Sequence, residues 1–396
     1  MIYLDNAATT KIDASVFKTM LPYLRENYGN PGALYKLGRD AKNAINLARS
    51  QVANLFGAEP ENIIFTSSGS EGNNLVIKGL ADHLKSIGKT HILVSAVEHD
   101  SVLEAANSLI KQGFYVEQVP VTREGYVQTE TVEKLLRPET GLVSVMHSNN
   151  ETGACNPVSE IAGICRKRDV LFHTDCVQAA GFYCINMKET GADFATISAH
   201  KIHGPKGAGA ICAMNPGLLS SQISGGGSQE FGLRAGTENV AAIVGFGAAC
   251  TKASRIREQQ LFVSTLKQRF FLTFFQKLRE SGADKLIAVN GPSATEPGKV
   301  LSLCVRGIDA QSLILMADTC GLCVSAGAAC CSGENTPSHV LTAMGISDED
   351  ARSSVRISFS YANSTEREAV EAAEILAGCV KTLLSRTLTG FCEVCI

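Results

Sequence analysis

The sequence predicts an α/β protein in which a mostly parallel sheet is flanked by helices and is followed by a smaller α+β part. Two features of the residue pattern support this. Between residues 63 and 213, short apolar runs alternate with helical stretches, and after residue 284 strands and helices follow in no regular order. Alternating strands and helices form βαβ units whose strands lie parallel in one sheet. Sites in such sheets gather at the carboxyl ends of the strands.

Length and composition limit the classes of protein to consider. The chain has 396 residues, 45% hydrophobic and 19% charged, which is ordinary for a soluble enzyme of two or three domains. Its net charge of −3 gives no electrostatic reason to bind nucleic acid or an acidic membrane. No apolar run is long enough to cross a bilayer, and the first residues lack the basic and apolar regions of a secretory signal. We therefore expect a cytoplasmic protein.

The expected elements follow in order along the chain. Residues 2–10 should form a short strand and a polar turn, and a helix should run to about residue 27. A second helix should span 37–56, where apolar residues recur at helical spacing until Gly57. One long helix is expected over 73–87. The seven strands expected in the main sheet are 63–66, 91–97, 114–119, 142–147, 170–174, 194–198 and 208–213.

The last third of the chain should form the α+β part. Two helices, 238–254 and 258–280, lead into it, and the second has apolar positions at helical spacing. Further strands are expected at 286–290, 300–305, 322–325 and 354–359, and helices at 310–319, 337–344 and 365–384.

Lys201 lies between the apolar runs 194–197 and 208–212, so we expect it on a tight turn between two strands. Desolvation at such a place favours the neutral amine, which can form a Schiff base with a carbonyl cofactor. The alternative is a solvent-exposed basic turn, as in most loops that contain lysine. Residues at the other strand ends are needed to decide between these interpretations.

Other strand ends carry polar residues suited to a flat, phosphorylated cofactor. Gly69 and Ser70 open a helix whose backbone amides could bind phosphate, although Ser70 could simply cap that helix. Asp175 could pair with a protonated pyridine nitrogen, or could cap a helix itself. His99 could stack on a cofactor ring, or could make an ordinary hydrogen bond in a loop.

Two further residues could bind a substrate. Asn150 follows the expected strand 142–147 and could reach the same crevice. Arg356 lies near the start of the expected strand 354–359, where it could hold a carboxylate through two hydrogen bonds. The alternative for Arg356 is an ion pair at the surface.

The chain has 14 cysteines, many of them inside apolar stretches, where they act as small core residues. A disulfide framework is not expected in a long cytoplasmic chain. Cys330 and Cys331 lie in a loop of small residues, as an exposed nucleophilic thiolate requires. A metal site would need about four ligands, and Cys320 and Cys323 lie in an apolar passage from helix to strand, so we expect no metal.

Taken together, these segments resemble those of the cysteine desulfurases of the NifS/IscS-like group, enzymes of fold type I that depend on pyridoxal 5′-phosphate (PLP). The resemblance runs from Tyr3 to about Phe359 and is carried by motifs in the same order and spacing. They are residues 3–10, Phe65-Thr66-Ser67, Glu98-His99, 149–153, 173–179, Ser198-Ala199-His200-Lys201, 204–207, 234–239, the loop ending at Cys330, and Val355-Arg356-Ile357-Ser358.

The resemblance implies a role for each candidate residue. Lys201 would be the Schiff-base lysine, His99 would stack on the pyridine ring as a catalytic residue, and Asp175 would pair with the ring nitrogen. The ring hydroxyl would be contacted by Gln178. The phosphate would be held by Gly69, Ser70, Ser198 and His200, with Thr237 reaching in from the other subunit of a homodimer.

For the substrate, the resemblance implies that Asn150 and Arg356 position the carboxylate of L-cysteine and that Cys330 accepts its sulfur. The products would be L-alanine and a persulfide on Cys330, whose sulfur passes to an acceptor protein such as an iron–sulfur scaffold, or to tRNA thiolation. The family also implies a large domain at 13–257 and a small domain at 1–12 and 258–396, with the cysteine loop at about 322–335.

The chain departs from the family pattern at several places. Cys331 follows Cys330, Ser70 stands for the usual threonine, and Phe231 stands for an arginine. Residues 30–35 differ from the usual segment, and Cys392 and Cys395 in the tail have no family counterpart. These departures concern partner choice and specialisation more than the chemistry. Three alternatives stay open beside the desulfurase: a selenocysteine lyase, a PLP aminotransferase, and a redox or metal protein built on the same fold.

Overall fold

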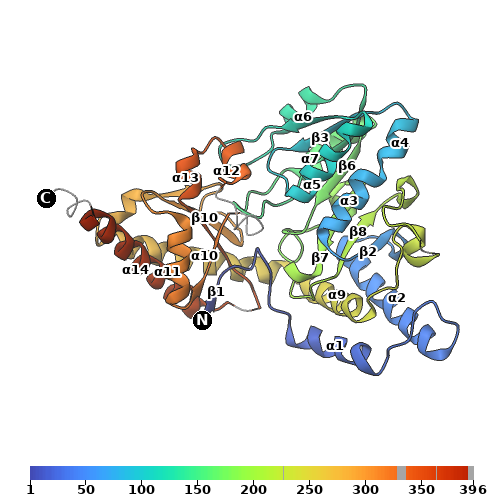
Figure 1. Cartoon of the computed structure of the whole chain (residues 1–396), viewed down its shortest axis with the longest axis horizontal. Helices are drawn as coiled ribbons and strands as arrows, with labels where there is room; N and C mark the ends of the chain where they lie inside the picture. Colours follow the sequence, from blue (N-terminus) through green and yellow to red (C-terminus); the bar gives the residue numbers. More distant parts are fainter. Residues whose placement is uncertain (226, 328–335, 363, 391–396) are drawn as a thin grey trace.

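The structure is a computed structural model that describes residues 1–225, 227–327, 336–362 and 364–390 (Figure 1). Its centre is a seven-stranded sheet with the strand order β2-β8-β7-β6-β5-β3-β4. Neighbouring strands are parallel except at β8, which is antiparallel to both β2 and β7. The predicted fold class is confirmed. The strands are β2 (Ile63–Thr66), β3 (His91–Ser95), β4 (Tyr115–Val119), β5 (Thr140–Ser144), β6 (Leu171–Asp175), β7 (Phe194–Ser198) and β8 (Gly209–Ala213).

Helices cover both faces of this sheet. Successive residues of a strand point to opposite sides, so one strand contributes to two separate buried clusters. Ile63 and Phe65 belong to one buried cluster and Ile64 to another. The first cluster contains residues of α2 (Lys36–Phe56), α6 (Thr129–Leu135), α7 (Val158–Lys167) and α9 (Val240–Ala253), and the second contains residues of α3 (Gly69–Gly79), α4 (Ala81–Ser86) and α5 (Asp100–Ser108). α1 (Ala14–Arg25) packs against α9 and α8 (Met187–Thr190) packs against α7, and both helices add residues to the first cluster.

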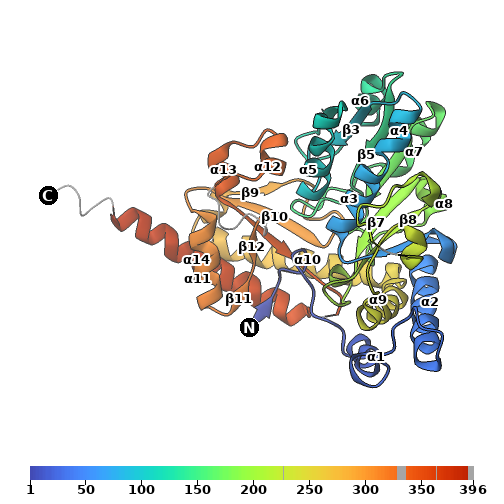
Figure 2. The same cartoon turned by 45° about the vertical axis from the view of Figure 1, so that its right-hand side comes forward.

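A second part of the molecule lies beside the main sheet (Figure 2). It has a four-stranded antiparallel sheet, β12 (Ser325–Ala326), β13 (Ser354–Ser358), β10 (Val300–Val305) and β9 (Ile287–Asn290), and a parallel pair, β1 (Ile2–Tyr3) and β11 (Leu322–Cys323). Its buried cluster includes Phe270, Leu303 and Leu376. The helices of this part are α10 (Ile256–Arg279), α11 (Ala310–Thr319), α12 (His339–Ala343), α13 (Asp348–Arg352) and α14 (Glu366–Gly390).

Two expected elements are divided in the structure. The expected helix over 73–87 is two helices, α3 and α4, because the Gly79 carbonyl accepts a hydrogen bond from the Ser220 amide (2.8 Å). The expected strand over 322–325 is also two, since β11 pairs with β1 while β12 pairs with β13. The domain boundary at 257/258 falls inside α10 and stays a prediction.

The loop between β8 and α9 is held to the main sheet by a buried ion pair. Arg49 of α2 donates to both carboxylate oxygens of Glu230 (2.8 and 2.5 Å), and the Phe65 amide donates to the same carboxylate (2.7 Å). Glu230 and Phe231 both have positive φ, at 44° and 59°. This backbone conformation is unfavourable for residues other than glycine. The ion pair therefore holds a strained turn in place.

No helix in the described ranges is long and apolar enough to span a membrane.

We predict that Arg49→Met lowers the free energy of unfolding by about 3–5 kcal/mol, because it leaves the Glu230 carboxylate buried without its cation. Urea unfolding measures this loss. Lys36→Met is the matched control, since the Lys36–Asp40 pair has side chains 82% and 44% exposed and should contribute about 0.5 kcal/mol or less. An Arg49→Met loss below about 1 kcal/mol would contradict the assigned role of the pair.

Candidate active site

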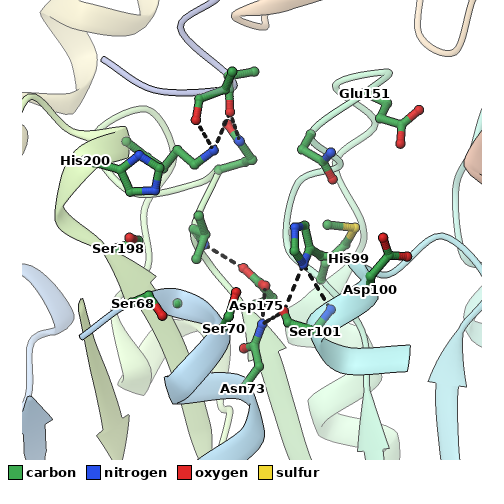
Figure 3. Close-up of a pocket in the computed structure, with 18 of the residues that line it drawn as sticks. Ser68, Ser70, Asn73, His99, Asp100, Ser101, Glu151, Asp175, Ser198 and His200 are labelled. Carbon is green, nitrogen blue, oxygen red and sulfur yellow. Dashed lines mark hydrogen bonds between the residues drawn. The ribbon is translucent and has the colours of Figure 1, made fainter. Parts of the chain in front are cut away.

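The carboxyl ends of five strands open onto one cavity of about 270 Å³, shown in Figure 3. β2, β3, β5, β6 and β7 all point to this edge, since β2 and β7 are both antiparallel to β8. Ser198 and His200 lie on one side of the cavity, and His99 and Glu151 on the other. The lining residues are Ala7, Ala8, Ser68, Gly69, Ser70, Asn73, His99, Asp100, Ser101, Met146, Asn150, Glu151, Asp175, Val177, Gln178, Ser198, His200, Lys201, His339 and Arg356.

Lys201 ends a single 3₁₀ turn, Ala199–Lys201, between β7 and β8, as the sequence predicted. Its Nζ donates to the backbone carbonyls of Ala7 (2.5 Å) and Ala8 (2.8 Å). These carbonyls belong to the segment that follows β1, so the N-terminal segment fixes the position of the amine at the cavity wall.

The segment from Ser68 to Ser70 forms a concave backbone surface at the start of α3. The Ser68 hydroxyl caps the helix by accepting from the Glu71 amide (3.1 Å), so Ser70 is not the capping residue and its side chain is exposed. A Cβ at Gly69 would lie 2.8 Å from a Val177 methyl group, and one at Gly209 would lie 2.6 Å from the Ser68 carbonyl carbon. Glycine at both positions therefore allows the loop to approach β8 and the cavity closely.

Ser198 and His200 face this same corner. Ser198 Oγ is buried and has no hydrogen-bond partner among the described residues. The His200 ring contacts Thr9 Oγ1 through Nδ1 (3.1 Å), and burial, together with the charges of Lys201 and Lys206, lowers the pKa of His200 to about 4. His200 is therefore a neutral hydrogen-bonding group at pH 7 rather than a cation.

Asp175 ends β6 and is 4% exposed. Its Oδ1 accepts from the Val177 amide (2.8 Å) and its Oδ2 from Asn73 Nδ2 (2.8 Å). The nearby Gln178 donates through Nε2 to the Ala7 carbonyl (2.9 Å), while its Oε1 is buried with no hydrogen-bond partner in the described part of the chain. Both side chains keep acceptor capacity toward the cavity.

His99 lies across the cavity and is the N-terminal capping residue of α5. Its Nδ1 accepts from the Ser101 amide (3.1 Å) and lies 2.9 Å from Ser101 Oγ. The ordinary loop hydrogen bond considered from the sequence therefore exists, and His99 faces the cavity as well.

Arg356 on β13 links the two sheets at the cavity. Its Nη2 forms an ion pair with Asp5 (2.9 Å), and its Nη1 donates to the carbonyls of Asn150 (3.1 Å) and Gly327 (2.8 Å). Its Nε is buried and has no partner among the residues that the structure describes. The side chain is 2% exposed, so the surface ion pair considered from the sequence is wrong: the ion pair is buried.

Most residues predicted for the site come together in this cavity. Thr237 does not line it and is exposed, after the loop that carries Glu230. Cys330 and Cys331 lie outside the described residues, as do Cys392 and Cys395. The described residues contain no group of three or more His, Cys, Asp and Glu side chains that could hold a metal ion.

Several cavity residues were missed by the sequence analysis. Ser101 lies in the first turn of α5, and Asn73 lies one turn into α3; the spacing of Asn73 from Gly69 was an available signal. Glu151 accepts from Ser338 Oγ (2.6 Å), and burial raises the pKa of its carboxyl group. No sequence pattern indicated Lys299, which lines a small second cavity together with Lys201. Burial and the charge of Lys201 lower the pKa of Lys299 to about 7.

Comparison with known proteins places this geometry in context. Residues 2–371 match the family model described as aminotransferase class-V. The chain is 39% identical over 365 residues to a protein named cysteine desulfurase IscS from Dictyoglomus turgidum, covering 92% of this chain and 91% of the relative. Among solved structures, a NifS-like protein superimposes with a TM-score of 0.86 at 32% identity, over 96% of this chain and 99% of the other. A structure titled SspA in complex with cysteine gives a TM-score of 0.78 at 31% identity, covering 92% of this chain and all of the other (100%).

Glu98, next to His99, gives a pH-dependent prediction. It is fully buried, and its Oε1 accepts from Ser95 Oγ (2.7 Å) and the Met146 amide (2.6 Å). Burial raises the pKa of Glu98 from 4.5 to about 8. A carboxyl with a raised folded-state pKa stabilises the fold below its unfolded pKa and loses this contribution as pH rises through the folded pKa.

We therefore expect wild-type stability to fall relative to that of Glu98→Gln between about pH 4.5 and 8, by at most about 1.4 kcal/mol per pH unit. Glutamine keeps the accepting oxygen and cannot ionise. Urea unfolding of both proteins at several pH values measures the difference, with Glu61→Gln at an exposed position as the control for loss of a carboxylate. Parallel stability curves for wild type and Glu98→Gln would show that Glu98 does not titrate in this range.

Proposed function

This chain belongs to the class-V aminotransferase family and is a cysteine desulfurase, and on that premise we propose that it is a PLP enzyme whose sulfur acceptor is Cys330. The observation that carries the proposal is the single cavity onto which Lys201, Asp175, His99 and the start of α3 all open. Such a site suits a cofactor with an aldehyde, a ring nitrogen and a phosphate.

The polar groups of the cavity fit PLP. The amides at Gly69 and Ser70, at the positive end of α3, and the unpartnered hydroxyl of Ser198 are suited to a phosphate. Asp175 is suited to a protonated ring nitrogen, and the free Oε1 of Gln178 to the ring hydroxyl. When bound, PLP supplies an electron sink for a carbanion at the substrate Cα.

The protein's own residues then supply binding and proton transfer. Lys201 would hold the cofactor covalently through Nζ, and its neutral amine would take the proton from the substrate Cα. We assign the substrate carboxylate to Arg356, whose Nε is the unpartnered donor, and to Asn150 beside it. Asp5 holds the guanidinium in orientation through its ion pair at 2.9 Å.

Sulfur transfer requires a thiol at the same cavity. The Cys330 thiolate attacks the sulfur of L-cysteine, so that a new S–S bond forms, the substrate C–S bond breaks, and the products are L-alanine and a Cys330 persulfide. Two contacts support this assignment. Gly327, three residues before Cys330, accepts from Arg356, and Ser338, eight residues after it, donates to Glu151. A sulfur-acceptor protein in the cytoplasm, such as an iron–sulfur scaffold, would receive the persulfide sulfur.

A homodimer would complete the site. Phe17, Leu21 and Leu24 of α1 are exposed at helical spacing, and Tyr28 and Leu34 in the following connection are exposed too. An apolar face of this kind suits a second copy of the chain. Thr237 is exposed and does not line its own cavity, as expected if it reaches the phosphate in the partner's cavity.

The direct test loads the protein with PLP and measures sulfide and alanine released from L-cysteine in the presence of dithiothreitol. We expect both products in equal amounts. Lys201→Ala should lose the visible absorption band of the bound cofactor, whereas Cys330→Ser should keep that band and lose more than about 10³-fold in sulfide release.

Cys331→Ser is the matched control, since it removes a neighbouring thiol, and it should keep sulfide release. Full activity in Cys330→Ser would contradict the role of Cys330. Turnover of L-selenocysteine with none of L-cysteine would contradict the desulfurase reaction itself.

A second test concerns Thr237. We predict that Thr237→Asp, which places a carboxylate against the phosphate, and Lys201→Ala are each inactive alone. Mixed dimers, co-expressed with two affinity tags and purified by both, should regain about half of wild-type activity, because one of their two sites then has both native residues. Mixed dimers without activity would show that Thr237 acts within its own chain, and failure of the two tags to co-purify would contradict the homodimer.

A further inference from the structure

Asn73 lines the cavity and contacts both the end of β6 and the start of α5. It is on α3, one turn after Gly69, and is 1% exposed. Its Nδ2 donates to Asp175 Oδ2 (2.8 Å) and to Ser101 Oγ (2.9 Å). Figure 3 shows Asn73 below Asp175 and Ser101, with these contacts dashed. One amide group thus connects the end of β6 to the start of α5.

The direction of these hydrogen bonds is fixed by the carboxylate. An ionised Asp175 only accepts, so the NH₂ group of Asn73 must face it, and the second N–H then points to Ser101. The reversed amide would bring Asn73 Oδ1 against the carboxylate and lose both donors. In the observed orientation both N–H groups have acceptors, while Asn73 Oδ1 is buried without a partner in the described ranges.

The hydrogen-bond direction at Ser101 determines which of its groups can donate to His99. Because Ser101 Oγ accepts from Asn73, its own hydrogen is available for His99 Nδ1 at 2.9 Å. The Ser101 amide donates to the same nitrogen (3.1 Å). A nitrogen that accepts hydrogen bonds must keep its lone pair, so Nδ1 carries no hydrogen. The neutral His99 ring therefore carries its proton on Nε2.

We propose that Asn73 is a positioning residue that couples the carboxylate of Asp175 to the tautomer of His99 through the Ser101 hydroxyl. The proposal rests on the proposed function for the roles of Asp175 and His99 at the cofactor ring. It adds that these two residues act as one hydrogen-bonded unit, Asp175–Asn73–Ser101–His99, rather than independently. The unit would present a carboxylate and a defined imidazole tautomer to the same cavity.

The neighbouring Asn74 provides a control on the same helix. Asn74 has the same chemistry and lies on the same helix, but it donates to the backbone carbonyls of Ser70 (2.9 Å) and Ser101 (3.5 Å). It contacts neither Asp175 nor the His99 ring in any of these hydrogen bonds. Asn74→Ala is therefore a matched control for Asn73→Ala.

The first readout uses the full-length protein without cofactor and labels its 8 histidines with ¹⁵N. We expect the His99 signals of the wild type to show an unprotonated Nδ1 and a protonated Nε2. In Asn73→Asp the new carboxylate accepts the Ser101 hydroxyl hydrogen and turns it away from His99, so the Nδ1-protonated tautomer should increase. Asn73→Ala should shift the Nδ1 signal in the same direction by a smaller amount, and Asn74→Ala should leave it unchanged.

Ser101→Ala separates the two halves of the unit. It removes the hydroxyl and keeps the Asn73–Asp175 hydrogen bond, so the His99 signals should move while cofactor affinity changes little. In the double variant Asn73→Ala/Ser101→Ala, the His99 shift should be no larger than in Ser101→Ala alone, because the coupling passes through that hydroxyl.

The second readout is the dissociation constant for PLP. Asn73→Ala should weaken PLP binding at least about tenfold, since Asp175 loses a hydrogen bond to its charged form, whereas Asn74→Ala should stay within about twofold. Melting curves distinguish the proposed coupling from a purely structural effect. A purely structural effect would lower the melting temperature and leave the His99 tautomer unchanged. The proposal is overturned if His99 has the same ¹⁵N signals in wild type, Asn73→Ala and Asn73→Asp. If the wild type fails to bind PLP, the proposed function fails, while the His99 signals still decide the coupling.

Discussion

Parallel strands end at the same edge of a sheet, and the site depends on this constraint. β2, β3, β5, β6 and β7 come from parts of the chain far apart in sequence, yet their carboxyl ends deliver Gly69, His99, Asn150, Asp175 and Lys201 to one cavity. The antiparallel β8 makes this possible for β2, because it separates β2 from β7 and begins with Gly209, which leaves room for the turn at Ser68. The order of strands in the sheet therefore brings these five residues to one cavity.

The N-terminal segment connects the two parts of the molecule at this edge of the sheet, and the site depends on this connection as well. After β1 pairs with β11, Asp5 binds Arg356, the carbonyls of Ala7 and Ala8 accept from Lys201, and the Thr10 amide donates to the His200 carbonyl. Residues from the first ten positions therefore contact both the Lys201 turn and Arg356. A small shift of this segment would move the Lys201 amine and the Arg356 guanidinium together.

The sequence was sufficient for the fold class and for the main residues of the cavity, because strand ends can be recognised from apolar runs followed by polar residues. It was insufficient where contacts depend on tertiary packing. Nothing local to Asp5 reveals its ion pair with Arg356, and nothing local to Asn73 reveals that it bridges Asp175 and Ser101. The division of the helix over 73–87 depends on a hydrogen bond to Ser220, more than a hundred residues away. The roles given to Thr237 and Cys330 rest on the resemblance and on neighbouring contacts.

The central claim is that this cavity binds PLP through Lys201, and peptide mapping after reduction tests it most directly. The protein loaded with PLP is reduced with borohydride, which fixes the cofactor to its lysine, and is then digested and analysed by mass spectrometry. The geometry predicts the phosphopyridoxyl group on Lys201 alone, since Lys201 follows β7 at its carboxyl end and lines the same cavity as Asp175 and His99. Modification of Lys206 or Lys299 in place of Lys201, or of no lysine, would contradict the account.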